Sequence, residues 1–363
     1  MKELRKIQRT GGATYIISLP KAWVKQQGLR AGDIIVIESL PNGKLLLSPY
    51  EFEERRTQRK ARLVIHSKNS VNEMIRDFVT YYLAGYDLIE VRFDEGIRHY
   101  KNILKSFVRE RLIGVEIIEE SAQHILVQCI VRYNELPLKK AIERMSVLGE
   151  FMIDDAIRAF VDFDKDLAEE VIRRDNEVDR FYFYIVRQLK QLISEATIRL
   201  PDEMKHPREF LGYRLIVKSI ERVADHASKI ALSAKRLDNK LPEHLRGIFI
   251  KLSRDVRKIF RESITSFLER NGERAHTIID ESMKFSKNCD SLFLEILSNI
   301  DAKTAALISL VLDSIKRIAD YSADIAEITI NVSIINMSKN NRMIREDNTE
   351  RIKNPDTCLK NFL

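Results

Sequence analysis

The chain has 363 residues, of which 44% are hydrophobic and 32% charged, and it contains only 12 Gly and 8 Pro. This composition excludes a disordered or collagen-like chain, and the length predicts two or three domains rich in long helices. The formal net charge is +7, and residues 1–30 account for +6 of it because they hold seven Lys and Arg against one acid, Glu3. A basic end on a nearly neutral body is typical of a nucleic-acid-binding module attached to another domain, although a solvated surface without a ligand has the same pattern.

The three cysteines, Cys129, Cys289 and Cys358, are far apart in the sequence. Their spacing indicates neither a disulfide framework nor a thiolate zinc site, and it fits a reducing compartment. No segment has the run of about 20 apolar residues that crosses a membrane, and the basic N-terminus has no apolar signal core behind it. We therefore expect a soluble, cytoplasmic protein without membrane insertion.

The first 52 residues contain short β-rich segments around one short helix. Residues 13–19 favour a strand, Pro20 suits a first helical position, and the helix over 21–27 ends at Gly28, which suits a left-handed cap. Strands over 33–39 and 44–48 flank Asn42-Gly43, a strong hairpin signal. Because this segment has few large side chains for a core, the sequence predicts that two copies interlock.

Two motifs in this segment resemble the AbrB/SpoVT-type swapped-hairpin domain. They are Ser18-Leu19-Pro20-Lys21 and Gly28-Leu29-Arg30-Ala31-Gly32-Asp33. The resemblance implies a small swapped-hairpin β domain over residues 1–52, an obligate dimer, and DNA as its partner. The residues that it assigns to DNA contact are Arg5, Lys6, Arg9, Lys21 and Lys25. A module that only dimerises and touches no DNA is the alternative.

Residues 61–133 predict a small α/β domain after a charged linker over residues 51–60. The pattern is strand, helix, strand, helix, strand, strand, and Ser70 with Glu73 predicts a capping box at the start of the first helix. This segment has no Gly-rich phosphate loop and no catalytic constellation. A ligand-sensing domain and a plain spacer are both compatible with it.

The rest of the chain has a helical period and contains an internal repeat. Ala159-Phe160-Val161-Asp162 corresponds to Ser266-Phe267-Leu268-Glu269, and the segment 218–225 corresponds to 313–320. The fold class predicted for this region is therefore all-α, with two three-helix repeats over residues 137–238 and 241–337. Residues 338–363 form a polar tail.

The helical region resembles the PhoU family of phosphate-uptake regulators. The resemblance rests on Glu221-Arg222-Val223-Ala224-Asp225 and Arg317-Ile318-Ala319-Asp320, which are similar to that family's E-R-I-G-D segment. With its N-terminal domain, the chain resembles the AbrB-plus-PhoU regulators of archaea. The resemblance implies a role in phosphate homeostasis, with a phosphate ABC transporter ATPase as a possible partner.

Four carboxylates in the first repeat form a candidate metal site. Asp175 and Asp179 are four residues apart, as are Glu221 and Asp225, so each pair occupies one helix face at the edge of the buried stripe. All-oxygen ligands favour a hard multivalent cation such as Mg, Mn, Ca or Fe, and the PhoU resemblance also implies metal at such pairs. The alternative is that the pairs are solvated and neutralised by nearby cations, namely Arg174, Arg180, Lys218 and Arg222.

The second repeat is not expected to hold a full site, because Ser282, Ser286 and Lys316 replace three of the four acids. The aromatic run 181–184 is interpreted as core and partner surface rather than as a base-stacking platform. No nucleophile arrangement predicts an enzyme, and a metal-dependent hydrolase has no candidate base. The favoured hypothesis is a DNA-binding regulator, dimeric or larger, and its rival is an adaptor that acts through protein contacts alone.

Overall fold

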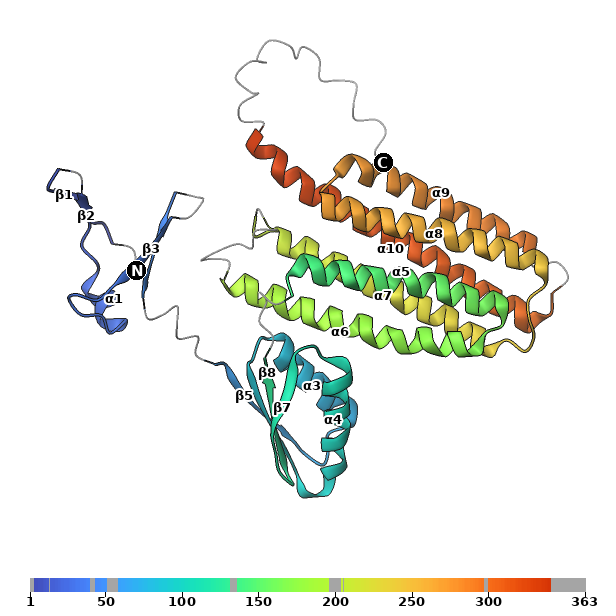
Figure 1. The fold of residues 1–363 in the computed structure, drawn as a ribbon, viewed down its shortest axis with the longest axis horizontal. Coiled ribbons are helices and arrows are strands. Elements are labelled where there is room, and N and C mark those ends of the chain that lie inside the picture. The colour runs from blue at the N-terminus through green and yellow to red at the C-terminus, as the bar shows by residue number, and fades with distance from the viewer. Residues whose placement is uncertain are drawn as a thin grey trace, which may run out of the picture. The chain divides into compact units, whose positions relative to one another are not determined.

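The structure is a computed structural model that describes residues 3–12, 14–39, 43–50, 58–130, 136–195, 204, 206–296 and 300–340. It divides into two compact units, Met1–Gln58 and Arg59–Leu363, which are described separately (Figure 1). Most of the predicted linker, Asn42 of the predicted hairpin, Cys358 and residues 341–363 of the predicted tail lie outside the described residues.

The N-terminal unit consists of two hairpins and one short helix. Strands β1 (Gln8–Thr10) and β2 (Thr14–Ile16) pair antiparallel, and so do β3 (Ile35–Ser39) and β4 (Leu45–Pro49). Between them lies α1 (Lys21–Gln26), after which Gly28 has the positive φ expected of a left-handed cap, +70°. No described residue of this unit is buried, so a single copy has no hydrophobic core.

The start of α1 differs from the prediction. Pro20 has an extended backbone, with ψ 125°, and is the residue before the helix rather than its first helical residue. Its carbonyl oxygen accepts the hydrogen bond from the Val24 amide that begins the helix. A proline without an amide hydrogen is tolerated there for the same reason as at the next position, since no intrahelical acceptor is available.

The second unit begins with a four-stranded sheet covered on one face by two helices. Its order is β5-β6-β8-β7, with β5 parallel to β6 and with β8 antiparallel to both β6 and β7. The predicted capping box at Ser70 and Glu73 is present at the start of the first helix. Alternating residues such as Leu63, Val91 and Ile125 lie side by side on the covered face and form its core. The elements are β5 (Lys60–Ile65), α3 (Val71–Leu83), β6 (Leu88–Phe93), the 3-10 turn η1 (Glu95–Ile97), α4 (Arg98–Arg111), β7 (Val115–Glu120) and β8 (His124–Cys129).

Six helices follow, as the two predicted three-helix repeats require. They are α5 (Leu138–Asp162), α6 (Lys165–Glu195), α7 (Glu209–Arg236), α8 (Glu243–Glu269), α9 (Gly272–Ile296) and α10 (Ala302–Asn340). They share one core, in which the Phe160 and Phe249 rings from the two repeats meet edge to face at 5.5 Å. The fold class predicted from the sequence is confirmed. Helix α10 continues to Asn340, beyond the predicted repeat boundary at 337.

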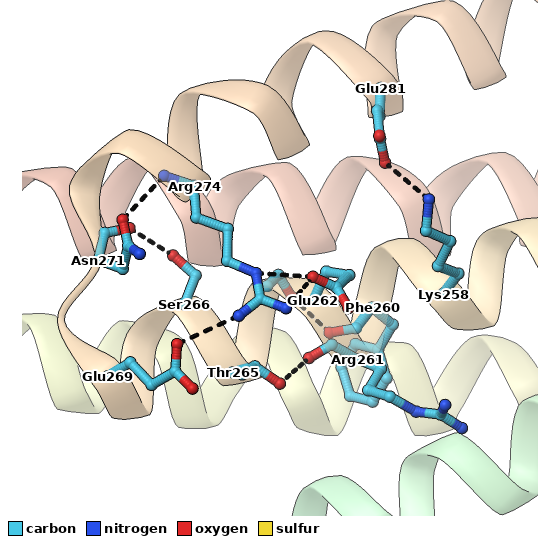
Figure 2. A network of polar contacts seen from close by, with 11 residues as sticks. Lys258, Phe260, Arg261, Glu262, Thr265, Ser266, Glu269, Asn271, Arg274 and Glu281 are labelled. Carbon is cyan, nitrogen blue, oxygen red and sulfur yellow. Dashed lines mark hydrogen bonds and ion pairs between the residues drawn. The ribbon is translucent and has the colours of Figure 1, made fainter.

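Equivalent turns close the first helix of each repeat. Phe163 after α5 and Arg270 after α8 both adopt the left-handed backbone, with φ of 59° and 56°. At the second of these corners, Arg274 of α9 contacts Glu262 and Glu269 of α8, and the Asn271 side chain accepts a hydrogen bond from the Arg274 amide (Figure 2). The local backbone is thus repeated even where the side chains differ. Among the described helices, none is both long and apolar enough to cross a bilayer.

Candidate functional site

The four predicted carboxylates come together where α6 packs against α7. Asp175 and Asp179 lie one turn apart on α6, and Glu221 and Asp225 lie one turn apart on α7. All four are half-buried, which agrees with their predicted place at the edge of the core stripe. Each of Asp175, Asp179 and Glu221 interacts electrostatically with acids of the other helix. We call these four residues the carboxylate cluster.

Two cations of the chain contact this cluster. The Arg111 guanidinium, at the last residue of α4 in the α/β domain, lies 2.8 Å from the Asp179 carboxylate. The Lys218 ammonium, one turn before Glu221 on α7, donates to its Oε1 at 2.6 Å. Neither Asp175 nor Asp225 has an ion-pair partner among the described residues. Two of the four carboxylates are therefore neutralised within the chain and two are not.

Burial and mutual repulsion raise the pKa of three acids of the cluster, Asp175, Asp179 and Glu221. The pKa of Asp175 rises from 3.8 to about 7, first because burial disfavours the charged carboxylate and then because of the negative charges of Asp179 and Asp225. Burial also raises the pKa of Asp179 and of Glu221, while Arg111 and Lys218 act in the opposite direction. The environment of the cluster thus favours the protonated form of these three carboxyl groups despite the two nearby cations.

The chemistry of these side chains suits a hard cation, but their present arrangement does not form a cage for one. Among the described residues, no group of three or more His, Cys, Asp or Glu side chains is arranged to hold a metal ion. Arg111 and Lys218 engage Asp179 and Glu221 instead. A cation shared by the cluster requires these two basic side chains to turn away. Metal binding therefore stays a prediction.

Only one of the four basic neighbours named from the sequence neutralises the cluster. Arg174 pairs with Asp155 of α5 at 2.6 Å, and the Arg222 guanidinium stacks over the Tyr321 ring of α10. Arg180 has a buried Nε without a hydrogen-bond partner among the described residues. The cation that matters most beside Lys218 is Arg111, which the sequence analysis missed because it lies 68 residues from Asp179.

In the second repeat the equivalent positions are satisfied by hydrogen bonds and an ion pair. The Ser282 hydroxyl donates to the Ala319 carbonyl at 2.8 Å, and the Ser286 hydroxyl donates to Asp320 at 3.2 Å. Lys316 pairs with Asp290 at 2.7 Å. These contacts engage the Ser282, Ser286 and Lys316 side chains within the chain.

The five candidate DNA-contacting residues are all exposed in the N-terminal unit. Arg5 precedes β1 and pairs with Glu3, and Arg9 lies in β1 and donates to the Gly12 carbonyl. Lys21 and Lys25 lie one turn apart on α1, and Lys6 lies just before β1. Their exposure leaves the positive charge available to a polyanion.

The aromatic run 181–184 joins the two parts of the second unit. Phe183 packs against the core of the α/β domain, whereas Phe181 packs against the core of the helical bundle. Tyr184 is buried and donates its hydroxyl to the Leu136 carbonyl at 3.0 Å. The run is therefore packing surface, as predicted.

Comparison with known families agrees with this architecture. The PhoU domain family matches residues 142–234 and again residues 249–329, which are the two helical repeats. The family described as antidote-toxin recognition MazE, bacterial antitoxin, matches residues 8–55. The helical bundle is thus a duplicated PhoU domain. The chain therefore carries PhoU domains in its helical region and a MazE/AbrB-type domain at its N-terminus.

Several relatives match about half of this chain. The phosphate-specific transport system accessory protein PhoU homolog of Clostridium acetobutylicum is 26% identical over 202 residues, which cover 53% of this chain and 89% of the relative. The homolog of Zymomonas mobilis is 23% identical over 195 residues, which cover 52% of this chain and 81% of that relative. Among solved structures, PhoU from Pseudomonas aeruginosa is 22% identical with a TM-score of 0.46, covering 55% of this chain and 98% of that one.

Proposed function

We propose that this protein is a DNA-binding transcriptional regulator of phosphate uptake, with the PhoU domains as its sensor. The observation that carries the proposal is the union of a PhoU bundle with an N-terminal unit whose five candidate basic residues are all exposed. Its relatives are accessory proteins of phosphate-specific transport systems, and by that likeness the role is regulatory rather than enzymatic. A component of a phosphate transporter, such as its ATPase, is the candidate protein partner.

The N-terminal unit acts as a homodimer in this proposal. Its apolar side chains are exposed in the single copy, with Tyr15 at 70%, Ile34 at 65% and Ile37 at 61%. The described residues of this unit include none that is buried, so burial in one copy does not offset the entropy lost on folding, and a second copy is the natural cover for these side chains. Analytical ultracentrifugation of the full chain is expected to give a dimer or a larger assembly, and a monomer at micromolar concentration contradicts this step.

DNA binding is tested with the full chain on DNA from the region upstream of its own gene and of phosphate-transport genes. Because the contacts are to phosphates, affinity is expected to fall steeply with salt, at about one decade of affinity per decade of salt for each phosphate neutralised. The triple variant Arg5→Ala, Lys6→Ala, Arg9→Ala should weaken binding and flatten the salt dependence. The control variant Lys139→Ala, Lys140→Ala removes exposed charge from α5 and should bind like the wild type.

The rival function is an adaptor that regulates a phosphate transporter through protein contacts, with the N-terminal domain serving only to dimerise. It is favoured if the wild type and the triple variant bind DNA equally weakly and without sequence preference. Phosphate uptake measured in a host that lacks the gene tests the regulatory role itself, since both functions require uptake to change.

A further inference from the structure

Two helices together expose apolar side chains on one face of the bundle. Helices α7 and α10 pack antiparallel, as the contacts of Gly212 with Val332 and of the Arg222 guanidinium with the Tyr321 ring show. Large apolar side chains are exposed at both ends of the surface that these helices share, which we call the α7–α10 face. At one end they are Leu211, Leu215 and Ile334, and at the other end they are Leu232 and Leu310. Contact of these side chains with water is unfavourable, so the face is a candidate for contact with another molecule.

The middle of the α7–α10 face is charged, with a different sign on each helix. The exposed charged side chains of α7 are all basic, and Arg222 and Lys229 lie in this middle part. On α10 the exposed acids of the same stretch outnumber the exposed base Arg317, which already pairs with Asp320. These acids are Asp313, Asp324 and Glu327, and they and Lys229 have no ion-pair partner among the described residues. A hollow of about 260 Å³ lies between the two helices, with basic side chains on the α7 wall and acids on the α10 wall.

We propose that a second copy of this chain docks on the α7–α10 face, with α7 of each copy lying on α10 of the other. A two-fold axis that runs along the helices, in the plane of contact, produces this arrangement and keeps every residue at its own height along the bundle. Within one chain, Lys229 and Asp313 are level with each other, since both interact electrostatically with His226. The two-fold pairing therefore sets Lys229 of each copy against Asp313 of the other, and opposite charges meet along the middle of the face.

The apolar ends of the face fit the same two-fold pairing. Leu211 is level with Asn331, because its neighbour Gly212 lies between Ile328 and Val332 of α10. Since the axis preserves height, the exposed apolar side chains at each end meet those of the second copy. An axis across the helices would instead set α7 on α7, and the like charges would repel. A different partner would need acids over α7, bases over α10 and apolar groups at both ends, which is the pattern that this chain itself carries. The contact lies within the bundle, so it requires neither DNA binding nor pairing of the N-terminal units.

The first test is disulfide trapping in the full chain, in a Cys358→Ser background. The variants Leu211→Cys and Asn331→Cys are co-expressed with tags of different mass, so that like and unlike pairs separate on a gel. Mild oxidation should link unlike chains in preference to like chains, because the two-fold pairing sets position 211 against position 331 and not against itself. The control pairs Asn331→Cys with Phe151→Cys, an exposed position on α5. Equal rates of linkage for the two pairs overturn the proposal, even where the N-terminal units make the full chain a dimer.

The second test reverses charges on separate chains. Lys229→Glu in the chain that carries Leu211→Cys should slow the linkage by about fivefold, since it replaces an attraction by a repulsion of similar size. Adding Asp313→Lys to the chain that carries Asn331→Cys should restore the rate. This rescue can act only between copies, because the two changes are on different molecules. Lys251→Glu reverses an exposed charge on α8 and should leave the rate unchanged. A rate that ignores Lys229→Glu refutes the proposed pairing, and so does a slowing that Asp313→Lys does not relieve.

Discussion

Replacing Asp175 by Asn should stabilise the protein in a pH-dependent way. The pKa of Asp175 is raised from 3.8 to about 7 by burial and by the neighbouring carboxylates. Between these two pH values the folded state binds more protons than the unfolded state, so the free energy of unfolding decreases as pH rises. The loss of stability caused by ionising Asp175 is absent below about pH 4 and fully present above about pH 7. Asn keeps the shape of the side chain and removes the charge.

The size of the expected gain in stability follows from the rise in the pKa of Asp175. A rise of about three units corresponds to about 4 kcal/mol at 1.36 kcal/mol per unit. Asp175 is only half-buried, and solvent screening reduces this figure to about 2 kcal/mol. We therefore expect Asp175→Asn to be about 2 kcal/mol more stable than the wild type at pH 8 and of nearly equal stability at pH 4.

Urea unfolding from pH 4 to pH 8, followed by helical circular dichroism in the presence of a chelator, measures this difference. A second buried group makes the comparison with the variant necessary, because burial lowers the pKa of His226 to about 4. The unfolded state then binds more protons than the folded state between about pH 4 and pH 6.5, and this alone makes stability rise with pH. Subtracting wild type from variant cancels the His226 effect.

The control is Glu177→Gln, which removes a carboxylate from an exposed position on the same helix. It should leave the pH profile of stability unchanged. A difference between Asp175→Asn and the wild type that is constant from pH 4 to pH 8 would show that burial and the neighbouring carboxylates do not raise the pKa of Asp175 as described.

Two further outcomes follow from packing and from the cluster's composition. Gly212→Ala in α7 places a Cβ 2.8 Å from Val332 of α10 and should lower the thermal midpoint, with a loss of stability of about 1 kcal/mol or more. Gly247→Ala in α8 places a Cβ with nothing within 4 Å and should raise stability by about 0.5–1 kcal/mol. Equal effects of the two substitutions on the thermal midpoint would contradict the α7–α10 packing. Elemental analysis and Mn²⁺ titration should find a bound cation in the wild type and none in the double variant Asp179→Ala, Glu221→Ala, which should keep its helical circular dichroism; metal that survives the double change would place its site elsewhere.

Local patterns were sufficient to predict most of the fold. The spacing of Ser70 and Glu73 predicted a capping box because both partners lie within one helical turn. The repeat was visible because Ala159-Phe160-Val161-Asp162 corresponds to Ser266-Phe267-Leu268-Glu269. In the structure these segments precede equivalent left-handed turns at Phe163 and Arg270. Likewise the four acids were placed by helix period alone, since each pair needs only a spacing of four residues to share a face.

The partners of the site were harder to predict because they come from separate parts of the chain. Arg111 reaches Asp179 only after a whole domain has docked on α6, and nothing in the residues around Arg111 encodes that docking. Conversely, Arg174 and Arg222 lie beside the acids in sequence but point to Asp155 and Tyr321. Helix period states which residues share a face, while the identity of the neighbouring element depends on tertiary packing.

The absence of buried residues in the described part of the N-terminal unit makes its folding a question of mass action. If two chains must meet to cover Tyr15, Ile34 and Ile37, the unit is ordered only at chain concentrations above the dissociation constant of the pair. The abundance of the protein then becomes an input in its own right: doubling expression raises the population of paired N-terminal units more than twofold while they are scarce. The helical bundle has its own continuous core, so its folding does not require a second chain. Chain concentration therefore acts on the folding of the N-terminal unit and not on that of the bundle.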